Sequence, residues 1–86
     1  MTIFITPKFK KAYDKLPANI TKKTKKAISL LKQDIFYPLL RAKKLSGIED
    51  TWEARIDRSY RLTFQKEGDV IILQTIGPHD EGLGKK

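Results

Sequence analysis

The period of the hydrophobic pattern changes near residue 51, and this change constrains the fold more than any other feature of the sequence. Before that point, apolar residues recur at helical spacing, which is typical of one face of an amphipathic helix. From Thr51 onward, apolar and polar residues alternate, as they do in strands with one buried face. Helices followed by alternating strands predict an α+β fold.

Two helices are expected in the N-terminal half, after a short β-prone run at Ile3–Ile5. Thr6 and Pro7 have the residue types of a helix N-cap and first position. We expect the second helix to begin near Ala18 and to stop at Pro38. Each helix has an apolar face, formed in the first by Phe9, Ala12, Tyr13 and Leu16 and in the second by Ile20, Thr24, Ala27, Ile28, Leu31 and Ile35.

The first strand pair can be aligned from its side chains. Residues opposite each other in an antiparallel pair share a face, so apolar residues must oppose apolar residues. This requirement places Ile56 opposite Tyr60 and leaves residues 57–59 as the loop. It also places Arg55 directly opposite Arg61 on the exposed face of the sheet.

The second strand pair is aligned in the same way. Pairing Phe64 with Val70 leaves residues 66–68 as a loop, with Gly68 in its left-handed final position. The prediction is a single domain over residues 1–86, in which two N-terminal helices pack on one face of a small, mainly antiparallel sheet in the order β-α-α-β-β-β. Residues 80–86 are expected to form a mobile tail.

The positive charge is concentrated in the first half of the chain. Residues 1–44 contain twelve Lys or Arg and two acidic residues, a net of +10, whereas residues 45–86 contain six and eight, a net of −2. Such a basic half attracts polyanions. Nucleic acid is the favoured partner, with an anionic membrane or an acidic protein as alternatives, and the lysines on the back of the second helix could equally be a solvated surface.

Several classes of protein are disfavoured by what the sequence lacks. It contains no cysteine and one histidine, so neither disulfides nor a protein-built zinc site is expected. There is no glycine-rich phosphate loop, and we expect no metal and no cofactor. The longest apolar run, Val70–Leu73, is far too short to span a membrane. Without a signal-peptide pattern, the chain is expected to be cytoplasmic.

His79 is the candidate for proton transfer near neutral pH. RNA can be cut without a metal when its own 2′-OH attacks the adjacent phosphorus. Arg55 and Arg61 suit the charge that then develops on the phosphate, and a histidine suits protonation of the leaving oxygen. The alternatives are that His79 is merely structural and that the arginines extend into solvent or pair with Glu53.

Three segments resemble the RelE/ParE toxin superfamily, and more closely its mRNA-cleaving RelE, YoeB and YafQ-like branch. They are Lys-Lys-Leu-Ser-Gly at 43–47, the segment from Trp52 to Phe64, and Ile-Gly-Pro-His at 76–79; the Lys-Ala-Tyr-Asp-Lys-Leu-Pro phrase at 11–17 fits the helical hairpin. The resemblance implies the toxin of a type II toxin-antitoxin system. It implies a ribosome-dependent endoribonuclease that cleaves mRNA in the decoding site, has a cognate antitoxin, and reaches operator DNA only through that antitoxin.

The resemblance also implies roles for individual residues. Arg61 corresponds to the arginine that contacts the scissile phosphate, Arg55 to a basic or histidine position of the active site, and His79 to the acid or base of YoeB- and YafQ-like members. Weaker candidates for RNA binding are Lys43, Lys44, Arg58, Lys22, Lys25 and Lys26.

Two positions depart from that pattern. Leu39 stands where YoeB-like members carry a glutamate base, and the residues after His79 include no aromatic. The base is then a lysine or a histidine, or else the enzyme is weak or does not cut RNA. Because ParE toxins of the same fold inhibit DNA gyrase without cutting RNA, a gyrase inhibitor and an inactive RNA-binding relative remain alternatives.

Overall fold

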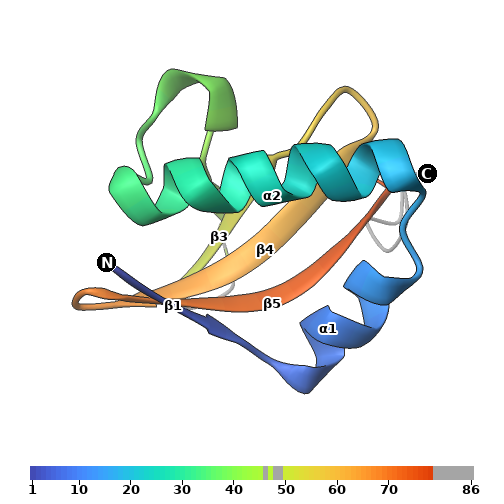
Figure 1. Ribbon diagram of the computed structural model, residues 1–86. Helices are drawn as coiled ribbons and strands as arrows, with labels where there is room; N and C mark the ends of the chain where they lie inside the picture. The colour runs from blue at the N-terminus through green and yellow to red at the C-terminus, as the bar shows by residue number, and fades with distance from the viewer. Residues whose placement is uncertain (46, 48–49, 79–86) are drawn as a thin grey trace.

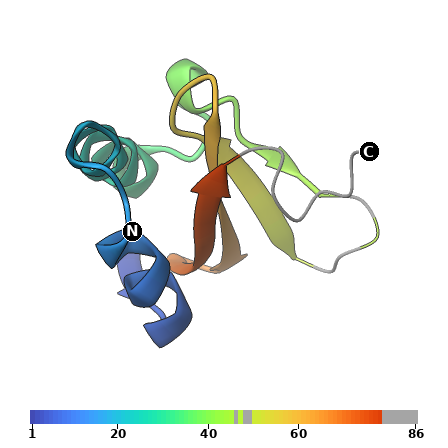
Figure 2. The same ribbon diagram turned by 90° about the vertical axis from the view of Figure 1, so that its right-hand side faces the viewer.

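The computed structural model describes residues 1–45, 47 and 50–78. In it two helices cover one face of a five-stranded sheet (Figures 1 and 2). The predicted α+β class and the order of helices and strands are confirmed. The elements are β1 Thr2–Ile5, α1 Pro7–Asp14, α2 Ala18–Gln33, the 3₁₀ helix η1 Pro38–Leu40, β2 Lys43–Lys44, β3 Thr51–Arg55, β4 Tyr60–Glu67 and β5 Val70–Pro78.

The sheet has the strand order β1-β5-β4-β3-β2. Strand β1 runs parallel to β5, whereas the other neighbouring pairs are antiparallel. The two helices connect one edge of the sheet to the other, which allows the first strand of the chain to pair with the last (Figure 1). The two-residue strand β2 forms at the opposite edge, in a segment that the sequence pattern treats as a connection.

The predicted start of α1 is confirmed in detail. The Thr6 hydroxyl oxygen accepts a hydrogen bond from the Phe9 backbone N–H (3.2 Å), and Pro7 occupies the first helical position. The same hydroxyl donates to the backbone carbonyl of Leu73 (2.7 Å). One side chain therefore caps the helix and attaches it to β5, which fixes where α1 leaves the sheet.

Helix α2 buries four residues of the predicted stripe, and its lysines are exposed. Ile28 is half-buried, and Ile35 is buried just beyond the end of the helix. The hydroxyl of buried Thr24 donates to the Ile20 carbonyl (2.7 Å), so its burial leaves no unpaired donor. The helix ends at Gln33, before the predicted stop at Pro38. Asp34 has an extended backbone, and its carboxylate accepts a hydrogen bond from the Phe36 N–H (2.9 Å), an arrangement that competes with the next helical turn.

The predicted register of the first hairpin is confirmed. The Ile56 N–H donates to the Tyr60 carbonyl (3.0 Å), which closes residues 57–59 as the loop. The pairs along β3 and β4 include Trp52 with Phe64, Ala54 with Leu62, and Arg55 with Arg61.

The predicted register of the second hairpin is wrong. Phe64 lies opposite Leu73 rather than Val70, and the strands are joined by a two-residue turn of Gly68 and Asp69. Gly68 has a φ of 58° at the first central position of this turn, where a type II′ hairpin turn favours glycine.

A β-bulge explains why alternation along β5 is misleading. Phe64 pairs with Leu73 but Thr63 pairs with Thr75, so Gln74 is an extra residue. A bulge reverses which residues face the core. Ile71 and Leu73 are therefore buried before the bulge and Ile76 after it. Strict alternation would put Val70, Ile72, Gln74 and Ile76 on one face, and the structure has no such face.

The core lies between the helices and the sheet. Phe9 of α1 and Leu31 of α2 pack with strand residues such as Leu62 and Phe64. Trp52 packs against this core and stacks on Phe64, with ring centroids 6.2 Å apart. Within the described residues, no helix combines the length and hydropathy needed to cross a membrane.

The bulged register makes a stability prediction. Leu73→Ala should lower the free energy of unfolding by about 2–5 kcal/mol, because it leaves a cavity in the core. Ile72→Ala, at a half-buried position on the other face, should cost about 1 kcal/mol, with less area lost to water. Urea unfolding of the two variants checks the order. A larger loss for Ile72→Ala would support the unbulged register instead.

Candidate functional site

Arg55 and Arg61 lie side by side on the sheet face opposite the helices. They are directly paired in the register of β3 and β4. Their chain neighbours Ala54 and Leu62 are buried beneath the helices, and side chains of successive strand residues point to opposite faces. The predicted juxtaposition of two arginines on the open face is therefore present, and both are half-buried.

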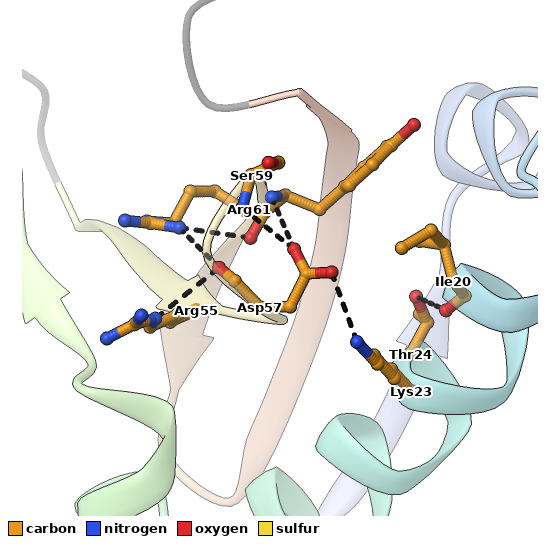
Figure 3. A network of polar contacts seen from close by, with 8 residues as sticks. Ile20, Lys23, Thr24, Arg55, Asp57, Ser59 and Arg61 are labelled. Atoms are coloured by element: carbon orange, nitrogen blue, oxygen red, sulfur yellow. Dashed lines mark hydrogen bonds and ion pairs between the residues drawn. The ribbon is translucent and has the colours of Figure 1, made fainter.

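The carbonyl oxygen of Asp57 holds the two guanidinium groups together. Arg61 donates to it from Nη1 (2.9 Å), and Arg55 donates to it from Nε (3.4 Å). The same Arg61 nitrogen also donates to the Tyr60 carbonyl (3.2 Å). Opposed like charges destabilise a strand pair, and here a shared acceptor offsets part of that repulsion (Figure 3).

The Asp57 carboxylate fixes the loop that carries this carbonyl. One of its oxygens accepts hydrogen bonds from the backbone N–H groups of Ser59 and Tyr60, both at 2.9 Å. The other lies 3.4 Å from the Lys23 ammonium of α2. Burial tends to raise the pKa of Asp57, but the two backbone hydrogen bonds and Lys23 outweigh it and hold that pKa below its ordinary value.

The arrangement leaves donors free for an anion. Each guanidinium carries five N–H groups in a planar fork, and the bonds to the loop engage only Nε of Arg55 and Nη1 of Arg61. In Figure 3 both groups extend to the same side, with their outer nitrogens away from the loop. Two forks side by side suit the oxygens of a phosphate.

A second row of side chains lies next to the arginine pair. In the sheet register, Lys43 is opposite Glu53, Glu53 is opposite Thr63, and Thr63 is opposite Thr75. The two threonine hydroxyls are 2.7 Å apart and hydrogen-bonded. On the other side of Arg61 its partner is Gly77, which has no side chain to fill that position.

The other predicted residues are placed unevenly around this site. The register puts Lys43 on the arginine face, but it puts Lys44 opposite Trp52 and so on the helix side. Arg58 is exposed in the loop beside Asp57. The predicted lysines of α2 are exposed and lie across the sheet from the arginines; they are Lys22, Lys25 and Lys26.

His79 and the expected tail at residues 80–86 lie outside the described residues. The described part of β5 ends at Pro78, opposite Tyr60. Since Tyr60 precedes Arg61, β5 ends beside the arginine pair.

Sequence reasoning missed the part played by Asp57 and Lys23. It placed Asp57 in the loop and Lys23 among the helix lysines, without connecting them. A usable signal was the spacing of Asp57 and Ser59, since an aspartate often accepts a hydrogen bond from the backbone two residues later. No local pattern could show that Lys23, more than 30 residues earlier in the chain, reaches this loop.

Comparison with known proteins places this geometry in a family. Residues 18–81 match the ParE-like toxin domain family. No curated protein is similar enough in sequence to match the chain.

Solved toxin structures share the fold over nearly the whole chain. The YoeB/ParE toxin from Agrobacterium tumefaciens has a TM-score of 0.78 at 20% identity, covering 92% of this chain and 99% of that one. The E. coli DinJ-YafQ complex gives 0.80 at 15% identity, over 95% and 96%. The archaeal RelE-RelB complex from Pyrococcus horikoshii gives 0.77 at 20% identity, over 93% and 96%. The predicted resemblance to the RelE/ParE superfamily and its fold is confirmed.

The lowered pKa of Asp57 predicts a dependence of stability on pH. A carboxylate with a depressed folded-state pKa stabilises the fold above its ordinary pKa of 3.8, and this contribution is lost as the pH falls through the folded-state value. Asp57→Asn should therefore lower the free energy of unfolding by about 1 kcal/mol at pH 7, and the difference from the wild type should shrink as the pH falls below 3.8.

Urea unfolding between pH 2 and pH 7 measures this difference. Asp69→Asn is the matched control, because Asp69 is exposed in the β4–β5 turn. A difference between wild type and Asp57→Asn that stays constant down to pH 2 would contradict the assignment.

Proposed function

The chain belongs to the ParE-like toxin domain family, and on this premise we propose that it is a type II toxin that cleaves mRNA in the decoding site of the ribosome. The observation that carries the proposal is the pair of guanidinium groups held on the Asp57 carbonyl. A gyrase-binding surface does not need two convergent phosphate-binding forks on an open sheet face. Two such groups suit an enzyme that stabilises the charge on a reacting phosphate.

In the proposed reaction the RNA supplies its own nucleophile. The 2′-oxygen attacks the adjacent phosphorus, and the 5′-oxygen of the next nucleotide leaves. Arg61 and Arg55 bind the non-bridging oxygens and stabilise the negative charge that grows on them in the transition state. His79 is proposed to protonate the leaving 5′-oxygen or to help remove the proton from the 2′-OH. The step as written needs no metal ion.

The proposed partners follow from charge and from the relatives. Two similar structures are complexes of a toxin with its antitoxin, RelE with RelB and YafQ with DinJ. We infer a cognate antitoxin for this chain as well, with operator DNA reached only through it. The ribosome and mRNA are the proposed targets in the cytoplasm, with ribosomal RNA held by the exposed lysines of α2 and by Lys43, Lys44 and Arg58.

Removing the arginine fork tests the proposal. Arg61→Ala should slow codon-specific cleavage by about 100-fold or more, the usual loss when a transition-state donor is removed. Arg61→Lys should restore only part of the rate, because an ammonium cannot make the forked contact. The measurement is toe-printing of mRNA on translating ribosomes, with Lys8→Ala, an exposed cation on α1, as the control.

The same preparation separates the alternatives. A wild-type protein that cuts no mRNA but traps cleaved DNA with purified gyrase would be a gyrase inhibitor. One that binds RNA and cuts neither substrate would be an inactive binding protein.

The lysines of α2 make a separate prediction about ribosome binding. Replacing Lys22, Lys25 and Lys26 together by alanine should weaken binding and reduce the slope of log K against log salt by about 2, since each lost phosphate contact removes ~0.7–0.9 of slope. Filter binding of the toxin to ribosomes at salt concentrations from about 50 to 200 mM measures the slope. An unchanged slope would show that these lysines are only a solvated surface.

A further inference from the structure

Glu53 is a buried carboxylate that the proposed reaction has not yet used. Only 7% of the residue is exposed. Among the described residues, no hydrogen bond or ion pair involves its side chain. A buried carboxylate without direct partners is costly, and a catalytic role is one of the explanations for such a group.

The position of Glu53 connects it to the arginine pair. It shares the open face of the sheet with Arg55, two residues further along β3, which places their Cα atoms about 6.6 Å apart. Across the strands it lies between Lys43 of β2 and Thr63 of β4. The carboxylate is thus in the row next to the guanidinium groups.

We propose that Glu53 is the catalytic base of the RNA-cleaving reaction, an inference that rests on the proposed function. The Glu53 carboxylate takes the proton of the 2′-OH as the 2′-oxygen forms its bond to phosphorus. The bond from phosphorus to the 5′-oxygen breaks, and that oxygen leaves with the proton delivered by the proposed acid, His79. The products are a 2′,3′-cyclic phosphate and a free 5′-hydroxyl end.

The geometry of RNA favours this division of labour. The 2′-OH and the scissile phosphate are attached to neighbouring carbons of one ribose. The base must therefore lie beside the two arginines that bind the phosphate, and not between them. Glu53 meets this condition, because it lies two residues from Arg55 in β3 and opposite the exposed Lys43. Asp57 does not, because its carboxylate is occupied by the loop and by Lys23.

Glu67 provides a matched control within the same strand pair. By the alternation of β4 it shares the open face with Arg61, but it lies six residues further along the strand, about 20 Å away. It is exposed. The change Glu67→Gln is chemically identical to Glu53→Gln and removes the same charge far from the arginines.

The test compares Glu53→Gln with Glu67→Gln in single-turnover cleavage of mRNA on programmed ribosomes. Glu53→Gln keeps the shape of the side chain but cannot accept the proton, so its rate should fall by about 100-fold or more. Its affinity for ribosomes should match that of Glu67→Gln, and its unfolding midpoint should be no lower, because the change removes a buried charge. A Glu53→Gln rate within about threefold of the wild type overturns the assignment.

A second variant separates a base from a structural carboxylate. Glu53→Ala leaves space in which added formate can act as the base, and formate should raise its rate about tenfold or more relative to chloride at equal ionic strength. A slow variant that formate does not rescue, or variants that do not fold, would show a structural role for Glu53 and contradict the proposal. If the wild-type protein cuts no mRNA, the proposed function itself fails; if the wild type cuts and both variants cut equally well, only the role of Glu53 fails.

Discussion

The hydrogen bonds around Asp57 are the constraint on which the site depends. Two arginines directly opposite each other in neighbouring strands repel, and without a fixed acceptor their side chains would separate into solvent. The carbonyl oxygen of Asp57 accepts from both, while its carboxylate accepts from Ser59 and Tyr60 and meets Lys23 of α2. One residue therefore closes the hairpin, orients the two cations and ties the loop to the helical layer, which leaves the outer nitrogens available to a phosphate.

Because side chains alternate along each strand, the core residues lie on one face of the sheet and the residues of the candidate site lie on the other. Even-numbered residues of β4, such as Leu62 and Phe64, pack beneath the helices, and odd-numbered residues, such as Arg61 and Thr63, form the open face. The bulge at Gln74 lets β5 serve both faces, because Leu73 and Ile76 reach the core while Thr75 and Gly77 stay beside Thr63 and Arg61. Glu53 belongs to the open face despite its burial, which is why its carboxylate stands apart from the core and next to the cations.

The elements that sequence predicted well are those governed by local chemistry. Thr6 and Pro7 are residue types favoured at the N-cap and first position of a helix, and the apolar faces of β3 and β4 admit one register. The pairing of Phe64 failed because both faces of β5 are apolar, so alternation could not reveal an extra residue at Gln74. The strand β2 was missed because Lys43 and Lys44 pair with β3 through the backbone alone, which leaves no hydrophobic pattern to find.

The sequence by itself determined the fold class, the first hairpin and the meeting of Arg55 with Arg61, because opposed apolar residues in adjacent strands impose that meeting. Only the tertiary structure decided that Lys43 shares their face while Lys44 does not, since an edge strand of two residues is placed by its neighbour. Tertiary packing also brought Lys23 to Asp57 and buried Glu53. These contacts depend on segments distant in the chain, whose relative position is fixed only when the helices close over the sheet.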